Sequence, residues 1–260
     1  MSWIGIIVLG AAGIASMKAA LERGDLDEAA RQGALAGPAV IEAALASPDR
    51  ATRLAGIVAA PATEDRAELL VPLAKLAADP DRRVARPAAQ AGRAIARELA
   101  ALEPTDDLAD ADVLAMRDDF AAVALDQTRW IDVRVAAIET AAALDQAIGR
   151  NLPRLLGVPV TIALADPDPA FRSAAITALP VPVPASVRTA LVTVVTSDAS
   201  PRVALTAAAT LCADLATDAP GPVLDALGAD GIAKVRTLVK QKDIAPQLVR
   251  DANRCLRAAR

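Results

Sequence analysis

One local pattern recurs along the 260-residue chain and limits the folds that it can adopt. A turn rich in Asp, Pro and Ser is followed by an apolar residue, an Arg and a run dominated by Ala; the clearest copy, DPDPAFRSAAI, begins at Asp166. The aligned positions are Arg53, Ala85, Arg134, Arg172, Arg202 and Arg250. Their intervals of 32, 49, 38, 30 and 48 residues bracket a unit of two antiparallel helices and two turns, which predicts an array of helical hairpins.

The segments that precede these turns are apolar with a helical period. In residues 67–78, Leu69, Leu70, Leu73 and Leu76 fall on one stripe. Residues 192–196 are β-branched, but they lie where the first helix of a hairpin belongs, and we predict helix there. The proline-rich segment 179–185 is predicted to be non-helical, and the acidic segment 103–112 is a candidate point of subdivision.

These residues resemble HEAT repeats, particularly the short bacterial kind related to bilin-lyase HEAT-like repeats. The resemblance rests on the Asp-Pro-Asp turn, the apolar-Arg pair and the Ala-rich run. It implies an all-α fold, a right-handed α-α superhelix (α-solenoid) of about six irregular hairpins, over residues 17–260. Helix chemistry agrees, because Asp caps a helix start, Pro is tolerated there, and Ala lets helices approach closely.

The first seventeen residues carry no charged side chain. Residues 1–16 are favoured as a signal peptide, with a small-residue cleavage site at Gly13-Ile14-Ala15, which would place the protein outside the cytoplasm, for example in the periplasm. Two alternatives stay open. The segment is short for a membrane anchor, and it would otherwise be the buried first helix of a cytoplasmic protein. A capping box at Asp25 and Glu28 then begins the next helix.

The composition excludes several classes of function. The chain has no His, which excludes His-based catalysis and His-based metal sites. Its net charge of −4 argues against nucleic acid as a partner. The acidic residues at 106, 107, 110 and 112 lack the glycine and glutamate register of a calcium loop. We therefore expect no catalytic residues, no metal and no cofactor.

Cys212 and Cys255 lie far apart and lack metal-site spacing. Two buried thiols are the favoured interpretation. The alternative is a disulfide that joins the last two helical units, which would suit an exported protein.

The candidate binding residues are Trp130, Arg134, Arg172 and Arg202. We favour a structural role for the recurring arginines, including Arg53, as donors to turn carbonyls and to Asp residues of neighbouring units. The alternative is a basic ladder that grips an acidic partner. Trp130 is either a packing residue or a binding hot spot. Arg82, Arg83 and Arg86 are favoured as a solvated patch.

The sequence therefore favours a non-catalytic scaffold or adaptor that binds another protein through the second helices of its middle hairpins. Membrane contact is expected only through the N-terminal apolar segment if that segment is not cleaved. The alternative is a bilin-lyase-like or other HEAT-like enzyme, or a subunit of one. A bound tetrapyrrole would reveal itself by visible absorbance of the purified protein.

Overall fold

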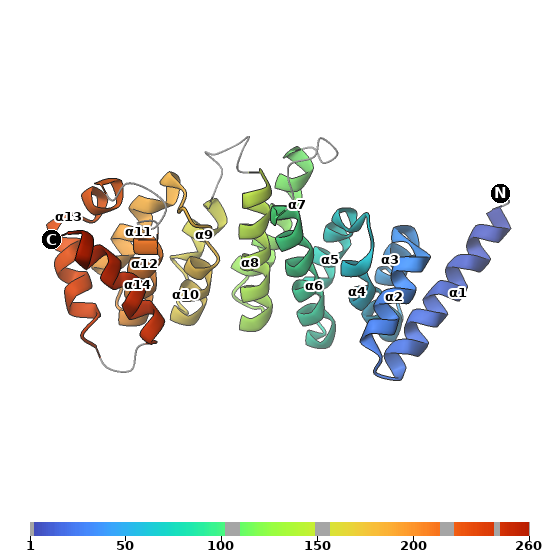
Figure 1. The fold of residues 1–260 in the computed structure, drawn as a ribbon. Coiled ribbons are helices and arrows are strands. Elements are labelled where there is room, and N and C mark those ends of the chain that lie inside the picture. The colour runs from blue at the N-terminus through green and yellow to red at the C-terminus, as the bar shows by residue number, and fades with distance from the viewer. Residues whose placement is uncertain (1–2, 102–109, 149–156, 214–220, 242–244, 260) are drawn as a thin grey trace. The chain divides into compact units, whose positions relative to one another are not determined.

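A computed structural model describes residues 3–101, 110–148, 157–213, 221–241 and 245–259 (Figure 1). These residues are predominantly α-helical, and they include no strand. The chain forms two compact units, residues 1–147 (unit 1) and 148–260 (unit 2). The division falls at 147/148 and not in the acidic segment 103–112, most of which lies outside the described residues.

Unit 1 is built from helices that contact their neighbours in order. Its α-helices are α1 (Trp3–Glu22), α2 (Leu26–Ala36), α3 (Pro38–Leu45), α4 (Arg50–Ala59), α5 (Leu70–Ala77), α6 (Arg82–Ala101), α7 (Asp110–Leu125) and α8 (Ile131–Ile148), and the short 3-10 helices η1 (Ala60–Ala62) and η2 (Arg66–Leu69) link α4 to α5. The odd-numbered helices contact in the order α1, α3, α5, α7, and the even-numbered ones in the order α2, α4, α6. The result is two layers of stacked hairpins.

Unit 2 follows the same plan. Its helices are α9 (Val158–Ala163), α10 (Pro169–Thr177), α11 (Ala185–Ser197), α12 (Pro201–Ala213), α13 (Gly221–Leu238) and α14 (Pro246–Ala258). The layers are α9, α11, α13 and α10, α12, α14. Helix α13 is kinked at Gly228, whose φ of 59° lies in the region that favours glycine.

The helix starts follow the chemistry of the turns. The carboxylates of Asp25, Asp49 and Asp168 cap α2, α4 and α10 by accepting from the amides of Glu28, Thr52 and Ala170. The predicted helix at 192–196 is confirmed within α11. Residues 179–184 contain no helix, as expected.

Small residues let the helices approach closely. A Cβ added to Gly33 of α2 would lie 2.2 Å from the Cβ of Ala59, at the end of α4. A Cβ added to Gly92 of α6 would lie 2.4 Å from the ring of Phe120, which is fully buried on α7. Small residues therefore permit close packing at these two contacts.

Helix α1 runs without a break through the predicted cleavage site at residues 13–15. Beyond that site, Met17 and Ala20 are completely buried. Helix α1 contacts α2, α3 and α4. In the described part of the chain, no helix combines the length and apolar character needed to cross a membrane.

Candidate functional site

The recurring arginine has a fixed place in three helices. Arg53, Arg134 and Arg172 are each the fourth residue of α4, α8 and α10. In α12 the fourth residue is Ala204, whose amide donates to the carbonyl of Ser200, and Arg202 is only the second. The alignment that paired Arg202 with Arg172 is therefore wrong by two residues.

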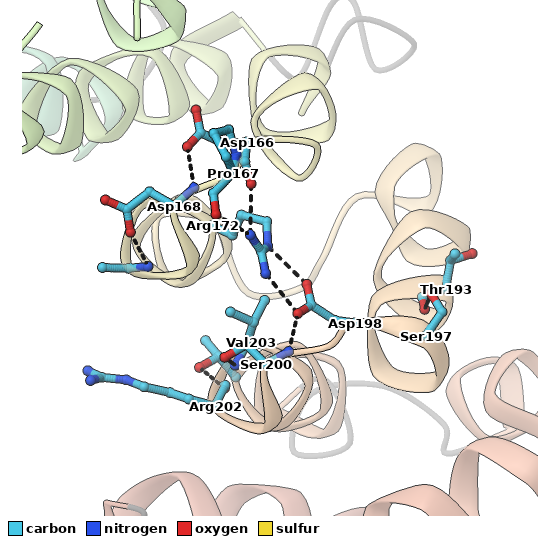
Figure 2. Close-up of polar contacts among 12 residues, drawn as sticks. Asp166, Pro167, Asp168, Arg172, Thr193, Ser197, Asp198, Ser200, Arg202 and Val203 are labelled. Carbon is cyan, nitrogen blue, oxygen red and sulfur yellow. Dashed lines mark hydrogen bonds and ion pairs between the residues drawn. The ribbon is translucent and has the colours of Figure 1, made fainter. Parts of the chain in front are cut away.

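Arg172 connects two consecutive hairpins of unit 2 (Figure 2). Its Nη1 donates to the carbonyls of Asp166 and Pro167 at 2.7 and 3.2 Å, in the turn before its own helix. Its Nε and Nη2 donate to the two carboxylate oxygens of Asp198 at 2.9 and 2.8 Å. Asp198 lies in the turn before α12 and also accepts from the Ser200 amide. This bidentate contact is the geometry in which Arg pairs best with a carboxylate.

Arg53 repeats this arrangement in unit 1. Its Nη1 donates to the carbonyls of Ser47 and Pro48 at 3.0 and 2.9 Å, and its Nη2 lies 3.7 Å from Asp79. Both Arg–Asp links span 26 residues of sequence, from 53 to 79 and from 172 to 198. The Nε of Arg53 is buried without a hydrogen-bond partner, so this link is the looser of the two.

The other predicted binding residues do not form one described site with Arg172. Arg134 is only 5% exposed, and its Nε donates to the carbonyl of Ala124. Trp130 is half-buried, and its carbonyl accepts from the amides of Val133 and Arg134 at the start of α8. Arg202 is exposed, its side chain forms no hydrogen bond or ion pair within the described residues, and it extends away from the turn (Figure 2).

A second series of ion pairs lies at the starts of the even-numbered helices of unit 1. Lys18 Nζ of α1 lies 2.8 Å from Asp49, the cap of α4, and Arg50 lies 3.3 Å from Asp81, which precedes α6. Both pairs span 31 residues. Hydrogen bonds from Lys18 and then from the Thr52 hydroxyl and amide hold the pKa of Asp49 well below its usual range. One carboxylate thus begins a helix and also joins it to a neighbour.

Helix α6 presents four arginines on one face, which we call the α6 stripe; its members are Arg82, Arg86, Arg93 and Arg97. Arg82 and Arg86 share Asp132 of α8, at 2.8 and 3.5 Å. Arg93 and Arg97 share Glu139 of α8, at 2.6 and 3.6 Å. Burial alone would raise the pKa of Asp132, but the hydrogen bond and charge of Arg82 outweigh it and the pKa is lowered. Two cations for each carboxylate leave the stripe positively charged.

Sequence reasoning missed the buried pair Arg117 and Asp145, which joins α7 to α8. Arg117 Nη1 lies 3.0 Å from Asp145, and their side chains are 7% and 5% exposed. Arg117 also contacts Asp118, whose side chain is 65% exposed. No sequence motif marks this pair, because its members are 28 residues apart.

The described part of unit 2 includes cavities between its helices. One, of about 440 Å³, lies between α9 and α11, where Thr193 and Ser197 line it beside Asp198 (Figure 2). Another, of about 520 Å³, lies between α13 and α14; its lining residues are Arg236, Val239, Lys240, Asn253, Leu256 and Arg257. We call it the α13–α14 pocket.

Cys212 of α12 and Cys255 of α14 form a disulfide, with their Cα atoms 5.3 Å apart. This bond holds α14 against α12, and both residues are completely buried. Within the described ranges, no group of three or more Asp, Glu or Cys side chains is arranged to hold a metal ion. Residues 106 and 107 lie outside those ranges.

No known protein family matches this sequence, and no curated protein matches it either.

Proposed function

We propose that this chain is a HEAT-like α-solenoid that acts as a non-catalytic scaffold, and that the α6 stripe binds an acidic surface of another protein. The observation that carries the proposal is the imbalance of charge on α6 and α8. Four arginines face two carboxylates there, in a chain whose net charge is −4.

The stacking of the helices supports the solenoid. Two layers of helices contact in chain order within each unit, and the Arg–Asp link recurs with the same 26-residue span in both. Stacked hairpins of this kind leave one layer of helices free to contact a partner along its length.

Exposure supports the choice of surface. The side chains of Arg86 and Arg97 are 56% and 62% exposed, and each makes the longer of the two contacts to its shared carboxylate. These two guanidinium groups can therefore turn toward a partner carboxylate while Arg82 and Arg93 keep Asp132 and Glu139 paired. Complementary charge of this kind raises both the rate and the selectivity of association.

The test compares tagged wild-type protein with the double variant R86E/R97E after cross-linking in the cells that produce it. Captured proteins are quantified by mass spectrometry. The matched control is R83E, because Arg83 is exposed on the same helix and its side chain forms no hydrogen bond or ion pair within the described residues. Circular dichroism checks that all three proteins are folded.

The expected result is one or more acidic proteins captured equally by the wild type and R83E, and depleted at least about tenfold with R86E/R97E. Equal capture by all three proteins would overturn the assignment of the stripe. Capture no greater than that of the tag alone would overturn the scaffold itself.

A further inference from the structure

The C-terminal end of the chain differs in charge from the rest. Residues 231–260 contain eight Lys and Arg but only two Asp, whereas residues 1–230 contain twenty Lys and Arg against thirty Asp and Glu. This asymmetry is concealed in the net charge of −4. Helix α13 as a whole has two acidic and two basic residues, so the positive charge belongs to its last turns, to the segment that follows it and to α14.

The α13–α14 pocket gathers part of this charge into one cavity. Arg236 lies in the last turn of α13, and Val239 and Lys240 lie in the turn that directly follows this helix. On α14, Arg257 lies one turn after Asn253, with Leu256 beside it. The lining residues of α14 therefore have the spacing i, i+3 and i+4, which places their side chains on one face of the helix.

The cations of this pocket are not used within the described structure. The side chains of Arg236, Lys240 and Arg257 form no ion pair or hydrogen bond with any described residue, and the described residues that line the cavity include no acidic one. By contrast, Arg254 on the same helix pairs with Asp251 at 3.2 Å. Val239 and Leu256 add apolar surface between the charges.

We propose that the α13–α14 pocket binds a short acidic peptide segment that carries an apolar side chain. The apolar side chain contacts Val239 and Leu256, and flanking carboxylates pair with Arg236, Lys240 and Arg257. The inference rests on the proposed scaffold function, because it gives the partner protein a second contact, in unit 2. A cavity of about 520 Å³ is large enough for a few side chains.

The lining favours a peptide over a nucleic acid. Single-stranded nucleic acids bind along extended basic grooves with aromatic side chains on which the bases stack. This pocket is a local cavity, and no aromatic residue lines it. The acidic remainder of the chain also repels a long polyanion.

The disulfide fixes one wall of the pocket. Cys255 lies on α14 between Asn253 and Leu256 in sequence and is bonded to Cys212 of α12. The binding test therefore uses the oxidised, full-length protein, in which α14 is held in place.

Fluorescence anisotropy tests the proposal with a fluorescein-labelled peptide, Glu-Glu-Leu-Glu-Glu-Leu-Glu. A second peptide with Gln in place of every Glu and a labelled single-stranded oligonucleotide are measured beside it. The variant R236E/R257E reverses two pocket charges. The matched control is R202E, which reverses an exposed, unpaired arginine of the same unit outside the pocket.

The acidic peptide is expected to bind the wild type and R202E with the same affinity and R236E/R257E at least about tenfold more weakly. The Gln peptide should not bind, and added salt should weaken binding of the acidic peptide. Equal affinity of the wild type and R236E/R257E would overturn the proposal, as would tighter binding of the oligonucleotide than of the peptide. A failure of this peptide-binding test is distinguishable from a failure of the capture test for the α6 stripe, because R236E/R257E leaves Arg86 and Arg97 unchanged.

Discussion

Arg172 on α10 and Asp198, in the turn before α12, are joined by two hydrogen bonds of 2.9 and 2.8 Å across consecutive hairpins. Their side chains are 13% and 8% exposed, so water competes little for either charge. The same guanidinium also binds the turn before its own helix, and one side chain thus holds two turns together.

We expect Arg172→Ala to lower the free energy of unfolding by about 3 kcal/mol, because it leaves the Asp198 carboxylate nearly buried without its cation. Urea unfolding followed by circular dichroism measures the loss. Arg202→Ala is the control and should cost less than about 0.5 kcal/mol, since Arg202 is exposed and unpaired in the described structure. Similar losses for the two variants would contradict the structural role of Arg172.

The two carboxylates that contact Arg117 should differ in their effect on stability. Asp145→Ala is expected to cost about 3–5 kcal/mol, because the side chains of Arg117 and Asp145 are both nearly buried. Asp118→Ala removes a contact to the same guanidinium but should cost less than about 1 kcal/mol, because Asp118 is mostly exposed. Urea unfolding measures the free energy of unfolding of both variants. A larger loss for Asp118→Ala than for Asp145→Ala would show that the buried Arg117–Asp145 pair is not the more important contact.

The disulfide closes a loop of 43 residues. In the chain-entropy treatment, a loop of this length corresponds to about 4 kcal/mol of stability. We expect reductant to lower the unfolding midpoint of the wild type and to leave that of the double variant C212A/C255A unchanged. The intact mass without reductant should be lower by two hydrogens. A wild-type midpoint that does not respond to reductant would show that the bond contributes nothing.

Asp126 should contribute to the loss of folding stability at low pH. Hydrogen bonds from the Thr128 hydroxyl and amide, followed by one from Arg129, lower its pKa from 3.8 to about 2 in the folded protein. A lowered folded pKa contributes stability above the unfolded value, and that contribution is lost as the pH falls through the folded value. Asp126→Asn should therefore be less stable than the wild type near neutral pH, and the difference should shrink between about pH 5 and pH 2. Unfolding curves of both proteins across that pH range measure the difference in stability. A difference that does not change with pH would contradict the prediction.

The helices and their starts could be predicted from the sequence because the signals are local. Asp25, Asp49 and Asp168 each cap a helix by accepting from an amide two or three residues later. The alignment of Arg202 with Arg172 was wrong because it treated Pro201-Arg202 as the apolar-Arg pair of the repeat. Helix α12 follows directly after Ser200, so its fourth residue is Ala204 and not Arg202.

Contacts between distant residues could not be predicted in the same way. The sequence shows that the arginines of the α6 stripe are spaced four, seven and four residues apart. That they pair with Asp132 and Glu139 depends on how α6 packs against α8, which the sequence does not show. The α13–α14 pocket likewise needs two helices to meet, although the excess of Lys and Arg after residue 230 was visible from the sequence.

The Arg–Asp link also has a direction. In both described links the arginine belongs to the earlier hairpin and the aspartate to the later one. In unit 1, two further junctions lack both members of the link: Ala29, the fourth residue of α2, is matched by Ser47, and Ala85, the fourth residue of α6, is matched by Thr128. Neighbouring hairpins are therefore not interchangeable, because exchanging them would leave a guanidinium or a carboxylate without its counterion. At the two linked junctions, a matched pair of charged residues thus specifies which hairpin follows which.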